Sequence, residues 1–258
     1  MSYLTIEKRQ RKSRLPARLD LAQSLTGLLL GLFIMGHILF VSAILLGPST
    51  AFWVDKMLEG AFLDPSGHGF PFLVSLSAFG VFCIFVTHAL LAMRKFPASW
   101  REYRVMQDQV EFLVHEDTKL WLYQAITGFI LFFFGSAHVL SMMFNPAQID
   151  PFLAAQRYFG QQMWIFYVIL LWAVVVHAGI GLYRVLIKWG WLGGDPRKMR
   201  KRIRVVQRIL TASYLVVGML SIAVYMQMGY QRQHEPTVRF GDTLYPQAPA
   251  AQPHQQMH

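Results

Sequence analysis

The sequence predicts an all-α membrane protein in which five transmembrane helices form a bundle. Hydrophobic residues make up 54% of its 258 residues and charged residues only 15%, against about 25% charged in ordinary soluble domains. Five apolar runs are each long enough to cross a hydrocarbon core, which needs about 20 helical residues. The charged residues gather in the stretches between these runs.

Helices are expected for all five runs because lipid offers no partner to an unpaired backbone group and the alternation of barrel strands is absent. The first run follows a basic segment, as in a signal peptide. It is too long for a signal peptide and contains a histidine, so we expect it to remain uncleaved. The expected helices span residues 21–46, 71–93, 120–144, 163–187 and 209–228.

The chain is expected to divide into three parts. Residues 1–20 form a basic N-terminal segment, residues 21–228 the transmembrane domain, and residues 229–258 a tail rich in Gln and Pro that we expect to be flexible. Between the first two helices, residues 52–63 mix apolar and charged side chains. This mixture predicts a short amphipathic helix at the outer membrane interface.

The lysines and arginines predict the orientation in the membrane. Twenty of the 24 lie before the first helix, between the second and third, or around the connection of the fourth and fifth. The other four are Lys56, Arg157, Arg232 and Arg239. The positive-inside rule therefore predicts a multi-pass protein of the inner (cytoplasmic) membrane, with its N-terminus in the cytoplasm and its C-terminus outside. The positive-inside pattern accounts for the net charge of +10. The charge therefore does not indicate a nucleic-acid partner, and none is expected.

Cysteine usage excludes several classes of cofactor site. The single cysteine, Cys83, cannot form a disulfide framework, a zinc ribbon or a four-thiolate iron–sulfur cluster within this chain. No C-x-x-C-H motif is present, which excludes a covalently attached c-type haem. Cys83 lies in an apolar run, where we expect a small buried side chain.

Histidines inside the expected helices are the strongest indication of function. There are four, one on each of the first four helices: His37, His88, His138 and His177. An ionisable side chain in a membrane span is costly and is by default a functional hypothesis. One such histidine could simply bond a neighbouring carbonyl. Four on successive helices make that explanation weaker.

The depth of these histidines divides them into two pairs. At 1.5 Å of rise per residue, His37 lies about 24 Å and His138 about 27 Å from the inner ends of their helices. By the same measure, His88 lies about 26 Å and His177 about 21 Å from the outer ends. The first two therefore share the outer half of the membrane and the other two the inner half. A six-coordinate haem needs two imidazoles from different helices at one depth. The sequence therefore predicts two haems b that together carry electrons across the membrane.

Each haem also carries two propionates that need cations or hydrogen-bond donors. Candidate partners are Gln23, Ser24, Trp121 and Lys188 at the inner helix ends and Arg157 at the outer side. Lys188 is equally well explained as a flanking charge of the positive-inside pattern. For Arg157 a propionate contact is the favoured explanation, because nothing else in the sequence requires a cation there.

Four stretches around these residues resemble a known family. It is the di-haem cytochrome b membrane anchor of menaquinol:fumarate reductases and related succinate:quinone oxidoreductases, in its single-subunit, five-helix form. The similarity extends over about residues 8–228. The stretches are KSRLPARLDLAQSLTGLLLGLFIMGHILFVSAILLG (12–47), HALLAMRKFP (88–97), QAITGFILFFFGSAHVL (124–140) and HAGIGLYRVLIKWGW (177–191).

The resemblance implies the same four haem ligands, in the same pairs, and the same propionate partners. It also implies a quinol site near the outer haem with a glutamate in the first outer loop, where this chain has Glu59. A carboxylate there can accept protons that quinol releases with its electrons. Alternatively, Glu59 is a solvated residue of the interfacial helix.

One position departs from the family pattern. Some members carry a glutamate two residues before the last haem histidine, where this chain has Val175. That glutamate carries protons across the membrane together with the electrons. Valine cannot relay a proton, so this route is missing or replaced. The coupling to the membrane potential and the working direction therefore stay open.

The function expected from this resemblance is transmembrane electron transfer. Menaquinol is oxidised near the outer haem, and the electrons pass through both haems to an iron–sulfur subunit and a flavoprotein that reduces fumarate. FAD and iron–sulfur clusters are expected on those cytoplasmic partners only, since this chain has no cysteine set and no glycine-rich nucleotide fingerprint. By resemblance, the complex could be a dimer.

Four other functions are kept as alternatives. The same parts could work in reverse, as the anchor of a succinate:menaquinone reductase. The chain could be the haem b subunit of a membrane hydrogenase or formate dehydrogenase, whose catalytic partner usually faces outward. It could be a structural anchor that passes no electrons. It could also be a haem-free transporter with a histidine proton relay, which would not require histidines paired by depth.

Overall fold

The computed structural model describes residues 13–65, 67–96, 99–102, 104–105, 116–191, 193 and 195–244. The regular structure of this part is helical, without strands. Five helices are long and apolar enough to cross a membrane, which confirms the predicted fold class. They are α1 (Leu15–Val41, continued by the 3-10 helix η1, Ser42–Leu46), α3 (Pro71–Met93), α5 (Glu116–Phe144), α7 (Trp164–Trp189) and α8 (Pro196–Gln231).

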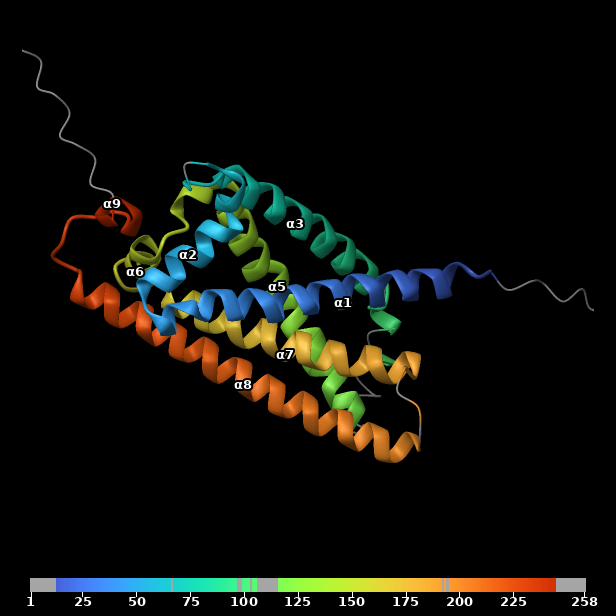
Figure 1. The fold of residues 1–258 in the computed structure, drawn as a ribbon. Helices are drawn as coiled ribbons and strands as arrows, with labels where there is room; N and C mark the ends of the chain where they lie inside the picture. The colour runs from blue at the N-terminus through green and yellow to red at the C-terminus, as the bar shows by residue number, and fades with distance from the viewer. Residues whose placement is uncertain are drawn as a thin grey trace, which may run out of the picture.

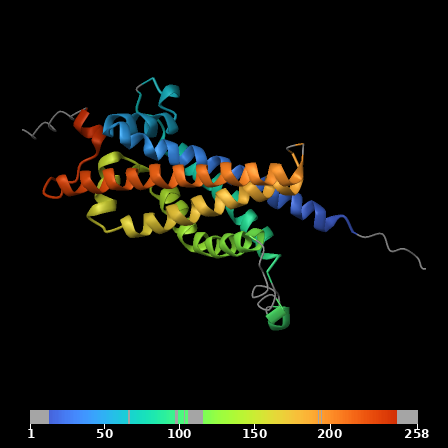
Figure 2. The same cartoon turned by 90° about the horizontal axis from the view of Figure 1, so that it is seen from below.

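Four of these helices form a ring. α1 packs against α3 and α7, and α5 packs against the same two helices (Figure 1). α1 therefore lies diagonally across the ring from α5, and α3 lies diagonally across from α7. Helix α8 lies outside the ring, along α7 and α1 (Figure 2). Cys83 on α3 is exposed at the surface of the bundle, so the expectation that it is buried was wrong.

Helix α8 is longer than the apolar run at residues 209–228. It begins at Pro196, whose fixed φ suits the first turn of a helix, and the Asp195 side chain caps it by accepting a hydrogen bond from the Arg197 backbone N–H. Arginine and lysine have good helix propensity. The basic connection between the fourth and fifth spans is therefore mostly helix rather than loop.

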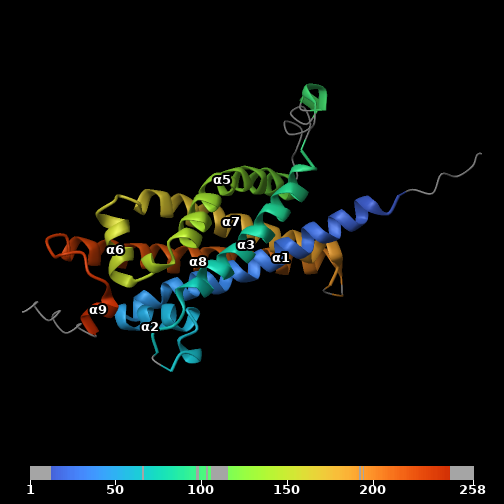
Figure 3. The same ribbon diagram turned by 90° about the horizontal axis from the view of Figure 1, so that it is seen from above.

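Short helices cover the end of the bundle that lies away from the N-terminus of α1 (Figures 1 and 3). We call this end the outer end and the opposite end the inner end, after the orientation that the sequence predicts. They are α2 (Pro48–Leu58), α6 (Pro151–Phe159) and α9 (Phe240–Leu244). α2 overlaps the predicted interfacial helix but begins four residues earlier, after Gly47, whose φ of 113° favours glycine and separates α2 from η1. The sequence analysis did not predict α6.

The first part of the C-terminal tail, residues 229–244, includes the end of α8 and contacts α6. α8 continues through Gln231, and the segment that follows it is attached to α6. Asp150, the N-cap of α6, also accepts hydrogen bonds from the Phe240 backbone N–H at 2.9 and 3.0 Å. Gln156 donates to Thr237 at 2.8 Å. Residues 1–12 and 245–258 lie outside the described residues.

Candidate functional site

The four histidines of the ring lie as two pairs. The imidazole centroids of His37 and His138, the outer pair, are 6.1 Å apart. Those of His88 and His177, the inner pair, are 6.5 Å apart. These are the pairs that depth predicts. The outer pair joins α1 and α5 and the inner pair joins α3 and α7, so each pair crosses one diagonal of the ring.

The spacing within each pair fits a metal ion between two imidazoles. A metal–nitrogen bond measures about 2 Å and the ring centre lies about 1 Å farther, so two imidazoles on one metal have centroids about 6 Å apart. Each pair offers only two ligands. Among the described residues, no group of three or more His, Cys, Asp or Glu side chains could hold a metal ion. A porphyrin, which supplies four further nitrogens to iron, fits this donor set.

Both inner histidines are contacted by the neighbouring helix. Nδ1 of His88 lies 3.1 Å from the hydroxyl oxygen of Thr26 on α1. Nδ1 of His177 lies 3.2 Å from the hydroxyl oxygen of Thr127 on α5 and 3.0 Å from the backbone carbonyl of Gln124. Polar groups of a neighbouring helix therefore contact Nδ1 of both imidazoles of the inner pair.

Glycines bring α1 and α5 close to these imidazoles. A Cβ atom added at Gly27 would lie 2.8 Å from Cε1 of His88. One added at Gly128 would lie 3.2 Å from Cε1 of His177. Each glycine directly follows one of the two threonines. The absence of a side chain is what allows the close approach of ring and helix.

The outer pair lies among aromatic side chains instead. His37 stacks on Phe33, with ring centroids 5.4 Å apart, and Tyr167 lies edge-on to His138 at 5.9 Å. Nδ1 of His138 is buried and has no hydrogen-bond partner among the described residues. Buried polar atoms without partners are uncommon in folded proteins and require an explanation.

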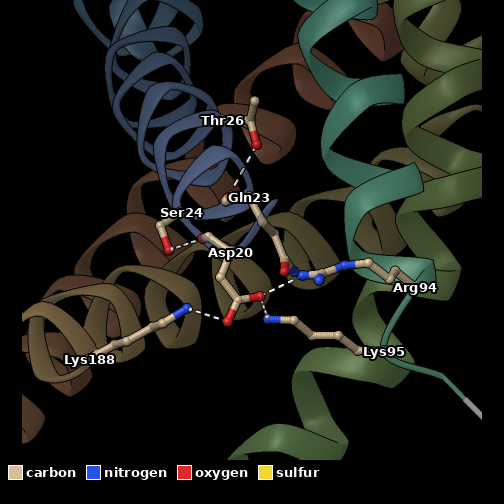
Figure 4. Close-up of polar contacts among 7 residues, drawn as sticks. All are labelled: Asp20, Gln23, Ser24, Thr26, Arg94, Lys95 and Lys188. Carbon is tan, nitrogen blue, oxygen red and sulfur yellow. Dashed lines mark hydrogen bonds and ion pairs between the residues drawn. The ribbon is translucent and has the colours of Figure 1, made fainter. Parts of the chain in front are cut away.

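Asp20 joins three cations at the inner end of the bundle (Figure 4). Its carboxylate contacts Arg94 at 2.5 Å, Lys95 at 3.2 Å and Lys188 at 3.1 Å. The group, which we call the Asp20 cluster, connects the inner ends of α1, α3 and α7. Three cations and one carboxylate give it a formal net charge of +2. Lys188 was predicted as a residue of the inner site, whereas no role was predicted for Asp20.

Other residues that the sequence predicts for the inner site lie beside this cluster. Ser24 is buried and donates to the Asp20 backbone carbonyl at 2.9 Å. Gln23 extends toward Arg94 (Figure 4), and its Oε1 atom is buried without a hydrogen-bond partner in the described part of the chain. Trp121 on α5 packs against Phe96, with ring centroids 6.4 Å apart.

The two predicted residues of the outer end, Glu59 and Arg157, each have a buried polar atom without a partner among the described residues. Glu59 is fully buried, so it is not a solvated residue of an interfacial helix. Lys56 donates to its Oε2 at 2.6 Å, and Oε1 is the unpaired atom. Arg157 donates to the Gln148 carbonyl at 2.6 Å, and its Nε is the unpaired atom.

A further acidic side chain at this end was not predicted as a site residue. Asp55 lies one helical turn before Glu59 on α2. Burial, together with the nearby carboxylates of Asp150 and Glu59, raises the pKa of the Asp55 carboxyl to about 7. The outer end therefore contains a group that exchanges protons near neutral pH.

The threonines that the sequence analysis missed belong to a repeated pattern. Residues 23–27 are QSLTG and residues 124–128 are QAITG. In both copies a histidine of the outer pair, His37 or His138, follows the threonine after the same interval of about three helical turns. A comparison of the first helix with the third for internal similarity would have found the pattern.

Comparison with known proteins identifies the family. Residues 101–222 match the family described as succinate dehydrogenase/fumarate reductase transmembrane subunit. The fumarate reductase cytochrome b subunit of Wolinella succinogenes is 42% identical over 240 residues, which are 93% of this chain and 93% of the relative. The chain belongs to this family.

Further relatives agree with this membership. The fumarate reductase cytochrome b subunits of two Helicobacter pylori strains are each 37% identical to this member over 231 residues, which are 90% of this chain and 89% of the relatives. The resemblance that the sequence analysis found is therefore confirmed. A transmembrane subunit with five candidate spans is a multi-pass membrane protein, as predicted.

Proposed function

We propose that this chain is the haem b-containing membrane anchor of a fumarate reductase complex and passes electrons from menaquinol to its partner subunits. The observation that carries the proposal is the presence of two imidazole pairs, one on each diagonal of the helix ring. His37 and His138 would hold the outer haem, and His88 and His177 the inner one. The names of the relatives support this role.

A bound haem b supplies a centre that gains and loses one electron at a time. Residues of this chain would hold the propionate edge of the haem. The two propionates of an inner haem would carry two negative charges, and the net charge of +2 on the Asp20 cluster would balance them. Gln23 and Trp121 offer neutral N–H donors at this end, whereas the Ser24 hydroxyl already donates to the Asp20 backbone carbonyl. At the outer end, the unused Nε of Arg157 is the corresponding donor.

We assign proton uptake at the quinol site to Glu59. Oxidation of a quinol releases two protons with two electrons, and a positioned base accelerates the step. Lys56 occupies one carboxylate oxygen of Glu59 and leaves Oε1 to accept a quinol hydroxyl. Asp55, with its pKa of about 7, lies one turn away and can pass the proton toward the outer surface.

Partners on the inner face complete the reaction. The chain has one cysteine and no nucleotide-binding fingerprint, so iron–sulfur clusters and flavin belong to an iron–sulfur subunit and a flavoprotein. The Asp20 cluster and the basic first turns of α8 make the inner end positively charged. Such a surface favours association with an acidic partner.

The same residues can serve the reverse reaction, in which succinate is oxidised and menaquinone reduced. Val175 is buried on α7 two residues before His177. An apolar side chain cannot bind and release a proton, so we infer that protons do not cross the bundle at this position with the electrons.

Haem content tests the proposal. The purified complex should contain two haems b per copy of this chain, and His138→Ala or His177→Ala should each leave one. His37→Ala combined with His138→Ala should still leave one, because both residues serve the same haem. His138→Ala combined with His177→Ala should leave none. His234→Ala, an exposed histidine after α8, is the control and should keep two. A full complement after either single change would contradict the proposal.

Purification from the membrane tests the partners and the electron donor. The chain should copurify with a subunit that contains flavin and a subunit that contains iron–sulfur clusters. A menaquinol analogue should reduce the haems of that complex without dithionite. A haem-containing chain that no menaquinol analogue reduces would be a structural anchor instead.

A further inference from the structure

We propose that Thr26 and Thr127 are positioning residues of the inner haem site. Each holds one ligand histidine of the inner pair by its Nδ1 atom, which leaves Nε2 for the iron and adjusts the redox potential of the inner haem. This inference rests on the proposed function, since it requires that His88 and His177 bind haem iron.

The hydroxyl protons of both threonines are already used. Thr26 donates to the Ala22 carbonyl at 2.9 Å, and Thr127 donates to the Tyr123 carbonyl at 2.7 Å. A hydroxyl group has one proton but can accept further hydrogen bonds. Toward the imidazole, each threonine oxygen therefore acts as an acceptor. The proton of that hydrogen bond must come from Nδ1 of the histidine.

Backbone carbonyls indicate the same tautomer. The Gln124 carbonyl lies 3.0 Å from Nδ1 of His177, and the Gln23 backbone forms the equivalent hydrogen bond with His88. A carbonyl oxygen can only accept. In a neutral imidazole with its proton on Nδ1, the lone pair is on Nε2. Both inner histidines are thus prepared to bind a metal through Nε2.

The arrangement occurs twice, on helices that face each other across the ring. α1 carries QSLTG and α5 carries QAITG, and in both copies the glycine after the threonine allows the imidazole to approach the helix. α1 and α5 each supply a ligand of the outer pair as well. Each of these helices would therefore support one haem through a threonine and ligate the other directly.

The expected electronic effect follows from the direction of the hydrogen bond. An acceptor on Nδ1–H increases the electron density that Nε2 donates to iron, and this stabilises ferric haem over ferrous haem. Removal of a threonine hydroxyl should therefore raise the midpoint potential of the inner haem. The outer pair makes no such contact with either threonine in the described structure, so the potential of the outer haem should not change.

The experiment compares Thr26→Val and Thr127→Val, which keep the side-chain shape, with Thr26→Ser and Thr127→Ser, which keep the hydroxyl. Thr87→Val is the matched control. Thr87 directly precedes His88, is exposed and donates to the Cys83 carbonyl at 2.8 Å, as Thr26 donates to Ala22. Each complex is analysed for haem content, for midpoint potentials by redox titration and for the low-spin ferric haem signals in the EPR spectrum.

Each valine variant should keep two haems and raise the potential of the inner one. At a fixed ambient potential, its ratio of ferrous to ferric form should increase about tenfold, which corresponds to about 59 mV for a one-electron couple. The EPR signal of the inner haem should shift as well. The inner haem is assigned with the His138→Ala protein, which keeps only that one. The serine variants and Thr87→Val should match the unmodified complex.

Four other outcomes bear on the inference. A valine variant that loses the inner haem, while the serine variant keeps it, still supports the inference. Equal potentials in valine variants and the unmodified complex would refute it, as would serine variants that differ as much as valine variants. A complex without haem before any substitution would instead refute the proposed function.

Discussion

The two ends of the helix ring are built differently. At the inner end, both histidines have hydrogen-bond partners on a neighbouring helix, and the surrounding cations share the Asp20 carboxylate. At the outer end, the histidines lie among aromatic rings, and Nδ1 of His138, Oε1 of Glu59 and Nε of Arg157 are buried without partners among the described residues. At the inner end, Oε1 of Gln23 is buried without a partner among the described residues, whereas the outer end has three such atoms.

This difference is consistent with the proposed quinol site at the outer end. A buried polar atom without a partner costs free energy unless a ligand, an ion or water completes it. A site that exchanges quinol must have donors and acceptors available to the incoming molecule, whereas a site that only stores an electron can have all of them paired. The unpaired atoms at the outer end therefore agree with proton and quinol chemistry there.

The strongest test of the comparison is the loss of the outer base. Glu59→Gln keeps the shape of the side chain but removes the carboxylate that would accept a proton. We expect the rate of haem reduction by a menaquinol analogue to fall by about a hundredfold or more. Reduction by dithionite and the haem content should be unchanged. Glu235→Gln, a carboxylate paired with Arg232 after α8, serves as the control and should leave both rates unchanged.

The second test concerns the close contact at the inner end. Gly27→Ala places a Cβ atom 2.8 Å from the imidazole of His88 unless the two move apart. We expect the inner haem to be lost or bound at least tenfold more weakly, with the outer haem retained. Gly80→Ala, on the exposed side of α3 with no atom within 4 Å of the new Cβ, should keep both haems. Pyridine haemochrome analysis measures the difference.

Proton binding at the outer end gives a third test. The unfolded chain releases the Asp55 proton near pH 3.8 and the folded chain near pH 7. The free energy of unfolding should therefore fall as the pH rises between these values and stay constant above pH 7. Asp55→Asn removes this dependence. The melting temperature of the variant should exceed that of the unmodified protein by several degrees at pH 8, and the difference should shrink toward pH 4.5.

The smallest expected effect concerns the Asp20 cluster. Asp20→Asn leaves three cations facing one another without their shared carboxylate. The side chains of the cluster are partly exposed, so we expect a loss of only about 1 kcal/mol in unfolding free energy. The loss should be smaller at high salt, because salt screens the repulsion between the cations. An equal loss at low and high salt would show that charge is not the cause.

The transmembrane helices could be predicted because length and apolar composition are local properties. Helix α3, Pro71–Met93, coincides with the predicted run. The structure of the polar segments was harder to predict, because contacts with residues distant in the sequence determine it. Residues 237–244 are ordered through Asp150 and Gln156, and no pattern within the tail itself indicates those partners. The start of α8 was missed because its first turns are basic rather than apolar.

The proximity of the histidines could be predicted because the rise of a helix converts sequence position into depth. Their polar surroundings could not. The hydroxyl of Thr26 reaches an imidazole 62 positions away in the sequence, and a threonine in an apolar helix is usually explained by a bond to its own backbone. No role was predicted for Asp20, because its three cations are distant from it in the sequence.

The equal spacing between each threonine and the outer histidine on the same helix restricts how this protein can change. The spacing is about three complete turns, or about 16.5 Å of rise, so both side chains stay on one face. Inserting a single residue between Thr127 and His138 would rotate one of them by about 100° away from the centre of the ring. The distance along the membrane normal between the two proposed haems can therefore vary only in near-whole helical turns. Both α1 and α5 would have to lengthen together.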